Sequence, residues 1–405
     1  MGAFLESIQV SSVDVDEEKD EVEDEEAAND LSDSDVVTKY RAAGTIANEV
    51  LAKVMAACVP GVKAVELCQL GDDAIEELVG KIYNGKAKDG KKIDKGIAFP
   101  TCISPNACVG HYSPLASEDT VEIKEGDMVK IDLGVHVDGY IAVVAHTVVC
   151  GGAESKDRKA DVQMAAWQAA ECAVRMFKAG AKNHEITEMI AKVAESYKCS
   201  PVEGVLSHQM KKHVIDATKV VINKQTTEQQ VKEAVFENND VFAVDLVMST
   251  GEGKPKQHED RTTVFKRDLE QKYSLKMKTS RAFFSEVNAR FPTLPFTLRA
   301  GKDERSWKMG VVECKNHGMF VEYPVLHEKP DELVAQVKFT ALLLPSGNVV
   351  RITGGPAPLA TSEYAVEDPA LNDLLAQTAD PKKKKKANKK KKKGGEGDEA
   401  EAKAE

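Results

Sequence analysis

The sequence predicts an α+β fold made of two similar halves, each a pair of helices followed by strands. Two observations indicate this class: apolar residues recur at helical spacing in two pairs of segments, and long apolar runs typical of buried strands follow each pair. A third is an internal match around the turns between the paired helices, which indicates a duplication. The matched positions are Gly61, Lys63, Glu66 and Leu67 in the first half, and Gly180, Lys182, Glu185 and Ile186 in the second.

The first helix pair is predicted over residues 40–59 and 65–83, with Pro60 and Gly61 between them. Proline cannot continue a helix and glycine favours its C-terminal turn, so this dipeptide separates the two. The same periodicity predicts the second pair over residues 161–180 and 184–198. Strands are predicted over 127–137 and 139–149 in the first half, over 239–249 in the second, and over 334–347 and 348–353.

A basic insertion is predicted at about residues 251–330. The periodicity loosens after Thr250, and residues 254–281 carry nine basic and four acidic side chains. Within this stretch, helical spacing returns at residues 281–291. We therefore expect a small basic helical excursion from the main body.

Both ends of the chain are strongly charged and opposite in sign. Residues 1–35 contain 14 acidic side chains and one lysine. The segment has too few apolar groups to offset the loss of chain entropy on folding. Residues 1–36 are therefore predicted to be a disordered acidic segment and residues 377–405 a disordered lysine-rich tail, which leaves 37–376 as the folded domain. The first lysine run of the tail comprises Lys382, Lys383, Lys384, Lys385 and Lys386.

Composition excludes several classes of protein. No apolar run approaches the roughly 20 residues that span a bilayer, and the N-terminus lacks the basic start and apolar stretch of a secretion signal, so we expect no membrane insertion. The eight cysteines are scattered without a C-x-x-C pair, which disfavours a zinc ribbon and a disulfide scaffold. Reduced thiols in the cytosol or nucleus are the expectation.

Three predicted strands carry a charge in mid-run, at Asp132, Asp245 and Lys338. Burying an unpaired charge costs several kcal/mol, so such residues pair, bind a metal or face water. Two histidines, His111 and His208, stand near other strands, and two Asp with two His would suit a divalent metal. Lys338 would not, because an ammonium has no lone pair to donate.

Residues 96–149 resemble the core of type 2 methionine aminopeptidases, enzymes of the pita-bread fold. They resemble still more the proliferation-associated, or ErbB-3-binding, proteins, which share that fold. The resemblance continues through GVLSHQMKKHVIDATKVV, FAVDLVMSTGEGK, LKMKTSRAFFSEV and the lysine-rich tail, and it covers roughly residues 38–395. It implies a pita-bread fold for the duplicated domain.

The resemblance also implies a damaged metal site. In the active enzymes two Asp, one His and two Glu hold two metal ions that activate a water. These five positions correspond here to Asp132, Val143, His208, Asp245 and Lys338. Val143 cannot ligate a metal and Lys338 brings a positive charge, so we expect no catalytic residue, no metal and no cofactor.

The remaining pocket residues leave two points open. His111 stands at the substrate-contacting histidine, and a second pocket histidine corresponds to Asp216, although nearby His213 leaves that alignment undecided. We hypothesise that the Lys338 ammonium replaces the metal charge by pairing with Asp132 or Asp245; a solvent-exposed Lys338 would contradict this.

Lysine-rich segments predict a surface that contacts phosphates, with an ordinary solvated loop as the alternative. No pair of stacking aromatics typical of an RNA-recognition motif is present, so RNA would be read by shape and backbone. The predicted contacts are Lys86, Lys88, Lys91, Lys92 and Lys95, with a surface enlarged by Lys254, Lys256, Arg261, Lys266 and Arg267.

Near the C-terminus, Leu371, Leu374 and Leu375 form an LxxLL pattern. On a helix such a stripe either enters a groove of a partner protein or packs on the domain itself. The lysine-rich tail is compatible with a nuclear or nucleolar address and with tethering to RNA.

The resemblance implies a catalytically silent protein that binds structured RNA and the large ribosomal subunit near the nascent-chain exit. Regulation of ribosome assembly, rRNA processing, translation and cell growth would follow, in cytoplasm, nucleus and nucleolus. Two alternatives are an active or single-metal methionine aminopeptidase and a nuclear transcriptional co-regulator. Protein partners would use the tail or the LxxLL stretch, and DNA binding stays open.

Overall fold

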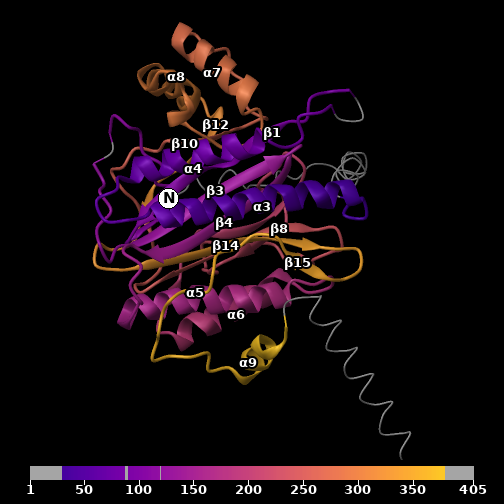
Figure 1. Ribbon diagram of the computed structural model, residues 1–405, viewed down its shortest axis with the longest axis vertical. Coiled ribbons are helices and arrows are strands. Elements are labelled where there is room, and N and C mark those ends of the chain that lie inside the picture. Colours follow the sequence, from indigo (N-terminus) through magenta and orange to yellow (C-terminus); the bar gives the residue numbers. More distant parts are fainter. Residues whose placement is uncertain (1–29, 87–89, 119, 379–405) are drawn as a thin grey trace, which may run out of the picture.

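A nine-stranded sheet forms the centre of the molecule (Figure 1). The computed structural model describes residues 30–86, 90–118 and 120–378. The main path of the sheet runs β1-β3-β4-β14-β8-β6-β7, with β15 beside β14 and β5 beside β8. These strands are β1 (Lys95–Pro105), β3 (Met128–Val137), β4 (Tyr140–Val149), β14 (Val334–Leu343), β8 (Val241–Ser249), β6 (Leu206–Met210), β7 (Val220–Ile222), β15 (Val349–Arg351) and β5 (Ser200–Pro201).

Four helices cover one face of this sheet: α3 (Ser34–Ala57), α4 (Ala64–Val79), α5 (Asp157–Met176) and α6 (Asn183–Ser196). Strand side chains alternate between the two faces. Alternate residues of β3, β4, β8 and β14 pack against the helices, among them Ile131, Val144, Val244 and Phe339. The intervening residues, which include Asp132, Asp245 and Lys338, therefore lie on the face turned away from the helices.

The predicted duplication is confirmed at the matched turns. Gly61 and Gly180 both have a left-handed backbone, with φ of 90° and 88°, which glycine adopts without steric cost. Lys63 and Lys182 are the N-cap residues of α4 and α6, and each forms a β-bridge with a later segment of its own half. The two halves are thus the same helix–turn–helix and strand unit used twice.

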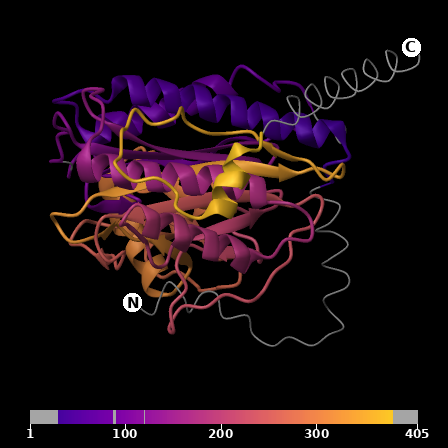
Figure 2. The same ribbon diagram turned by 90° about the horizontal axis from the view of Figure 1, so that it is seen from below.

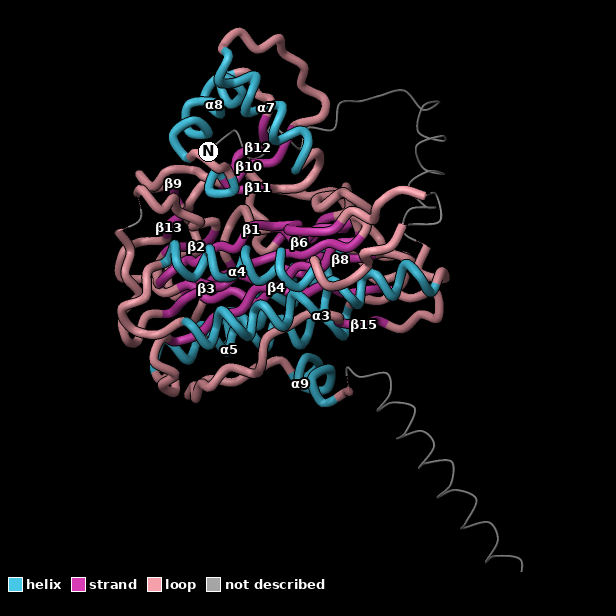
Figure 3. Tube along the Cα trace, turned by 45° about the horizontal axis from the view of Figure 1, so that its top comes forward, coloured by secondary structure: helices cyan, strands magenta, loops and turns pink. Residues whose placement is uncertain are grey.

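The insertion forms a separate small layer above the sheet (Figures 1 and 3). Its core contains Phe283, Phe296, Trp307 and Phe320. The insertion contains two α-helices, and the sequence predicted only α7. Helix α8 was missed because charged residues interrupt the apolar spacing of residues 304–316. The elements are β9 (Lys256–Gln257), β10 (Val264–Arg267), α7 (Lys278–Arg290), β11 (Phe296–Thr297), η1 (Leu298–Ala300), α8 (Glu304–Asn316), β12 (Phe320–Tyr323) and β13 (Leu326–His327); β13 pairs with β9 and with β2 (Cys108–Gly110).

The predicted N-terminal boundary is wrong for residues 30–36. Helix α3 begins at Ser34, Asp33 caps it by accepting a hydrogen bond from the Asp35 amide at 2.8 Å, and Leu31 and Val36 are buried. The burial of these two apolar side chains offsets the chain entropy of a segment whose charge alone predicted disorder. Residues 1–29 and the tail lysines Lys382, Lys383, Lys384, Lys385 and Lys386 lie outside the described residues.

The last helix, α9 (Pro369–Ala376), ends where the sequence placed the end of the domain. Viewed from below, it lies against α5 (Figure 2), and its N-cap residue Asp368 pairs with Lys192 of α6 at 2.9 Å. Within the described ranges, no helix combines the length and apolar character needed to cross a membrane.

Candidate functional site

Three charged side chains meet at the centre of the sheet, on the face away from the helices. Antiparallel pairing places Asp245 of β8 directly opposite Lys338 of β14. Lys338 is in turn opposite Ala145 of β4, and Ala145 is opposite Asp132 of β3. The small alanine between them lets Asp132 and Lys338 reach one another across β4.

The ammonium of Lys338 bridges the two carboxylates. Its Nζ lies 2.5 Å from Asp132 Oδ2 and 2.9 Å from Asp245 Oδ2. Gln336, two residues earlier on the same strand face, donates from Nε2 to Asp245 Oδ1 at 2.9 Å and to Asp132 Oδ2 at 3.4 Å. The hypothesis that Lys338 pairs with Asp132 or Asp245 is confirmed, and it pairs with both.

Burial controls the titration of this cluster. It raises the pKa of Asp132 to about 6, although the Lys338 ammonium acts to lower it. Burial also acts to lower the pKa of Lys338, but the charges of Asp132 and Asp245 outweigh it and hold that pKa above its usual value. Lys338 therefore stays protonated, and its positive charge is permanent at physiological pH.

Val143 stabilises the junction between the two halves of the sheet. Strands β4 and β14 share a single register pair. Hydrogen bonds from threonine hydroxyls to backbone groups make the other connections between them. The Val143 amide donates to Thr340 Oγ1 at 2.9 Å, and its carbonyl accepts from Thr340 at 3.0 Å and Thr353 at 2.7 Å. Thr147 makes the same kind of bridge to the backbone of Gln336, at 2.7 and 2.9 Å.

His111 is held as a neutral ring at the edge of the cluster. Its Nδ1 lies 3.1 Å from the Pro324 carbonyl, which makes this nitrogen the donor, and the ring packs between Phe99 and Tyr323. Burial, reinforced by the charge of Lys338, lowers the pKa of His111 to about 4. The imidazole is thus uncharged near neutral pH.

The environment of His208 resolves the open alignment of the second pocket histidine. Burial lowers the pKa of His208, and the carboxylate of Asp216 acts in the opposite direction. Asp216 forms a close ion pair with Lys266 of the insertion. His213 instead faces His136, with ring centroids 6.3 Å apart, so Asp216 occupies the pocket position.

The residues of this cluster do not fit a pair of divalent metal ions. Oxygen and imidazole ligands must offer lone pairs toward a shared centre. Here the space between Asp132 and Asp245 holds an ammonium, and Val143 presents an apolar side chain buried beside Phe99. The arrangement is a buried ion-pair network that joins β3, β8 and β14.

Comparisons with known proteins agree with this geometry. The model of metallopeptidase family M24 matches residues 38–265. ERBB-3 BINDING PROTEIN 1 of Arabidopsis thaliana is 48% identical over 391 residues, which is 96% of this chain and 97% of that protein. Proliferation-associated protein A of Dictyostelium discoideum is 44% identical over 354 residues, 86% of this chain and 90% of its own. The chain belongs to the proliferation-associated branch of family M24.

A solved structure of a thermophilic Arx1 superposes on this M24 chain with a TM-score of 0.80 and 34% identity. The superposed region covers 86% of this chain and 99% of the Arx1 chain. The expected pita-bread fold and family are therefore confirmed. Since the M24 family model extends across β3, β4, β6 and β8, it spans all the pocket positions except Lys338.

The first basic segment of the M24 chain lies ahead of β1. Lys86, Lys91 and Lys92 are exposed, while the half-buried Lys95 is engaged within the segment, with its Nζ contacting the Ile82 carbonyl and donating to Asn84 Oδ1 at 2.7 Å. Lys88 lies outside the described residues. As solvent-facing groups, Lys86, Lys91 and Lys92 keep their role as predicted phosphate contacts.

The second basic group does not enlarge the first, contrary to the prediction. Lys254 and Lys256 are exposed near β9, which joins β2 through β13, and β2 follows the far end of β1. The 11 residues of β1 put about 35 Å between its ends. Two separate basic surfaces result, one at each end of that strand.

Three basic residues of the insertion are engaged in internal contacts. Arg261 Nε lies 2.9 Å from Glu118 Oε2, and Lys266 pairs with Asp216. Arg267 donates to the Pro292 carbonyl at 3.2 Å and stacks over Phe284. Arg261 and Lys266 therefore tie the insertion to the main body, and Arg267 makes its contacts within the insertion.

The LxxLL leucines pack on the domain itself. Leu371 is buried in the core of the second half, and Leu374 and Leu375 are partly buried against the same core. Their stripe on α9 is occupied by this packing and is not presented as a partner motif. Of the two alternatives left open, packing on the domain is the one observed.

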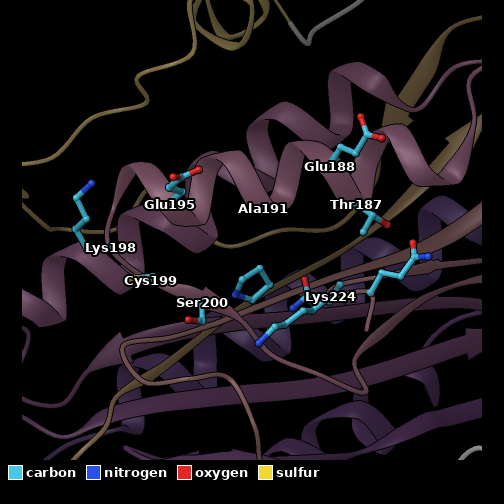
Figure 4. A pocket seen from close by; sticks show the side chains of 11 residues that line it. Thr187, Glu188, Ala191, Glu195, Lys198, Cys199, Ser200 and Lys224 are labelled. Atoms are coloured by element: carbon cyan, nitrogen blue, oxygen red, sulfur yellow. The ribbon is translucent and has the colours of Figure 1, made fainter. Parts of the chain in front are cut away.

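A hollow of about 620 Å³ lies under α6, away from the Lys338 cluster (Figure 4). Glu188 and Glu195 of α6 line one side, with Lys198 beside Glu195 just past the end of that helix, and Lys224 lies on the opposite side. The amide group of Asn223 at its floor is turned inward and donates to the Val202 and Val247 carbonyls at 3.2 and 2.7 Å. The hollow presents a mixed-charge wall with no grouping of catalytic side chains.

Two features of the site were missed from the sequence. Gln336 shares a strand face with Lys338 two residues away, so strand alternation alone could have placed it in the cluster. Buried Lys130 interrupts the same apolar run as Asp132, two residues away, so its place on that strand face could also have been predicted; its acceptors could not, because its Nζ donates to the Asn106 carbonyl at 2.7 Å and the Val334 carbonyl at 3.2 Å, which are backbone atoms brought together by folding.

Proposed function

We propose that this M24 chain is not a peptidase and that it binds structured RNA and the large ribosomal subunit through its basic surfaces. The observation that carries the first part is the Lys338 ammonium between Asp132 and Asp245, at 2.5 and 2.9 Å. A cation fixed there repels a metal ion, and no carboxylate at Val143 supplies a second bridging ligand. Two-metal activation of water then has no basis.

The test is hydrolysis of methionyl peptides in the presence of added Mn²⁺ or Co²⁺. We expect no turnover from the wild type, and none from Asp132→Asn. The double substitution Val143→Asp/Lys338→Glu restores the carboxylates and serves as the informative comparison for metal binding. Metal-dependent turnover by the wild type that Asp132→Asn abolishes would instead support the alternative, an active or single-metal aminopeptidase.

The second part of the proposal is supported by the exposed lysines and by the family. Lys86, Lys91 and Lys92 face solvent at one end of β1, and Lys254 and Lys256 do so at the other. Lysine contacts to phosphate add affinity that does not depend on base sequence and that weakens as salt rises. The resemblance of this chain to ErbB-3-binding proteins adds the expectation of a growth-related role in ribosome assembly and translation.

Salt-dependent co-sedimentation with large ribosomal subunits tests this binding. Lys91→Glu/Lys92→Glu should weaken association and reduce its dependence on salt, because two phosphate contacts are removed. A matched control is Lys53→Glu/Lys178→Glu, which changes charge equally at exposed positions on helices α3 and just after α5. Equal binding by both variants and the wild type at all salt concentrations would contradict the phosphate-contact mechanism.

A second candidate function is nuclear transcriptional co-regulation. It would have to act through the lysine-rich tail alone, because the LxxLL leucines pack on the domain. Because Leu371, Leu374 and Leu375 pack on the core, a truncation after Gln377 removes the lysines and leaves α9 in place.

We propose cytoplasmic, nuclear and nucleolar localisation, with the tail as the address. Fluorescence imaging of the truncated chain tests it: unchanged nucleolar signal would assign the address elsewhere.

A further inference from the structure

Three metal-binding side chains meet where the chain enters and leaves the insertion. His258 and Asp260 follow β9, and His327 ends β13. His258 Nδ1 lies 2.9 Å from Asp260 Oδ2, and His327 Nε2 lies 3.1 Å from the same oxygen. All three ligand atoms lie within 4.8 Å of one another. We propose that this triad binds one divalent first-row transition-metal ion of the Zn²⁺ type.

Strand pairing fixes the backbone on both sides of the triad. Leu326 pairs with Gln257 and His327 with Lys256, and the His258 amide donates to the Val325 carbonyl at 3.3 Å. The centroids of the two imidazole rings lie 4.4 Å apart, and the ring planes are tilted by 34° relative to one another. The ligands are therefore brought together by the fold before any ion arrives, which lowers the entropic cost of binding.

The spacing of the ligands suits a small tetrahedral ion. Metal–ligand bonds of about 2.0–2.2 Å place neighbouring ligand atoms roughly 3.3 Å apart. The carboxylate-to-imidazole distances of 2.9 and 3.1 Å need to widen by only a few tenths of an ångström, and the two imidazole nitrogens, which lie within 4.8 Å of one another, need to settle at the same separation. Two nitrogens and one oxygen match zinc, nickel or cobalt better than calcium or magnesium, which prefer all-oxygen sites.

The fourth ligand position faces solvent. The side chain of His258 is 54% exposed, while those of Asp260 and His327 are 30% and 26% exposed. Water can therefore complete a four-coordinate ion, and an ion can enter without unfolding the segment. A site of three protein ligands and one open position follows.

The location gives the ion a structural effect. The chain passes from the sheet through residues 256–260 into β10, and returns from β12 through residues 324–327 (Figure 3). These two passages form the neck of the insertion. An ion bound to His258, Asp260 and His327 would join the outgoing passage to the returning one and so restrain the insertion relative to the sheet. None of these residues belongs to the Lys338 cluster, so the inference is independent of the proposed function.

The experiment is a titration of the full-length protein with Zn²⁺ in competition with a chromophoric zinc indicator. We expect one Zn²⁺ per chain at micromolar or tighter affinity. His327→Ala and Asp260→Asn should each weaken binding about a hundredfold or more, because each removes a direct ligand. His184→Ala, at a half-exposed histidine on α6 beside Glu233, is the matched control and should bind as the wild type does.

Hydrogen exchange gives a second readout that does not depend on affinity. Zn²⁺ should slow exchange at residues 256–260 and 324–328 in the wild type and not in His258→Ala, whose exposed side chain can be removed without disturbing the core. Circular dichroism establishes that each variant is folded. Equal zinc affinity in the wild type and the three triad variants, or zinc binding without protection of the neck, would overturn the proposal.

Discussion

At the scale of single residues, the central feature is a lysine that holds two buried carboxylates together. Lys338 was expected from its position in an apolar strand to need a partner, and Asp132 and Asp245 were the available ones. Sequence reasoning reached this pairing because all three charges interrupt apolar runs. It missed Gln336, although strand alternation places this residue beside Lys338, and it could not reach Ala145, because the contribution of this alanine depends on register across three strands.

Replacing the bridging lysine should destabilise the fold strongly. Lys338→Met leaves Asp132 and Asp245 buried without their cation, and breaking such a pair costs about 3–5 kcal/mol. Urea unfolding monitored by circular dichroism measures the change. The triple variant Lys338→Met/Asp132→Asn/Asp245→Asn should recover part of the loss, because no unpaired charge remains. A triple variant no more stable than Lys338→Met would rule out the charge explanation.

Buried neutral histidines should make the protein sensitive to acid. Burial lowers the pKa of His111, His136 and His146 to about 4, below the unfolded value of about 6.5. The unfolded chain therefore binds more protons between pH 6.5 and 4, and stability is lost as pH falls through that window. Each histidine contributes up to about 1.4 kcal/mol per pH unit. Asp132, with its raised pKa of about 6, acts in the opposite direction and offsets one of the three.

Thermal unfolding between pH 7 and 4.5 measures this dependence. The variant His146→Asn removes one of the three contributions, so its slope with pH should be visibly shallower than that of the wild type. His184→Asn, on the surface of α6, is the control. A slope unchanged by His146→Asn would show that this ring does not stay neutral in the folded protein.

At the scale of elements, the two halves meet at a seam that hydroxyl groups close. Periodicity and the matched turns predicted the four main helices and the long strands, because those signals are local. The seam between β4 and β14 could not be predicted, since Thr147, Thr340 and Thr353 come from distant parts of the chain and read as ordinary strand residues. The neck strands β9 and β13 were missed for a related reason, since each is two residues long and is defined by tertiary contacts, whereas helix α8 was missed because charged residues interrupt its apolar spacing.

Loss of one seam hydroxyl should destabilise the protein moderately. Thr340→Val keeps the shape of the side chain but leaves the buried Val143 amide without an acceptor, at a cost of about 1–3 kcal/mol. The control is Thr45→Val, on the exposed side of α3, whose hydroxyl bonds only to the helix carbonyl of Arg41. Chemical denaturation of both variants decides: equal stabilities would mean that the hydroxyl bridge does not hold the seam.

At the scale of the whole molecule, the exposed lysines predicted to contact phosphates divide, within the described residues, into two surfaces at opposite ends of β1. Composition could locate the lysine-rich segments in the sequence but could not predict the distance between them in space, because that distance depends on the fold. The insertion residues Arg261, Lys266 and Arg267 were also beyond prediction, since their partners Glu118, Asp216 and Pro292 become neighbours only on folding.

Two separated surfaces should act independently on a partner that spans both. The affinity losses from Lys91→Glu/Lys92→Glu and from Lys254→Glu/Lys256→Glu should then add to within about 0.5 kcal/mol in the combined variant. Filter binding of a structured RNA long enough to reach both ends of β1 measures the three affinities. A large departure from additivity would indicate that the two groups contact one shared stretch of phosphates.

The Lys338 bridge also changes how the protein depends on its surroundings. A metal centre must be loaded after synthesis, and its occupancy follows the supply of free ions in each compartment. The cation in this sheet is part of the polypeptide, so it is delivered with the chain in fixed stoichiometry and cannot be removed by a chelator. Assembly of the central sheet therefore does not depend on the local concentration of metal ions.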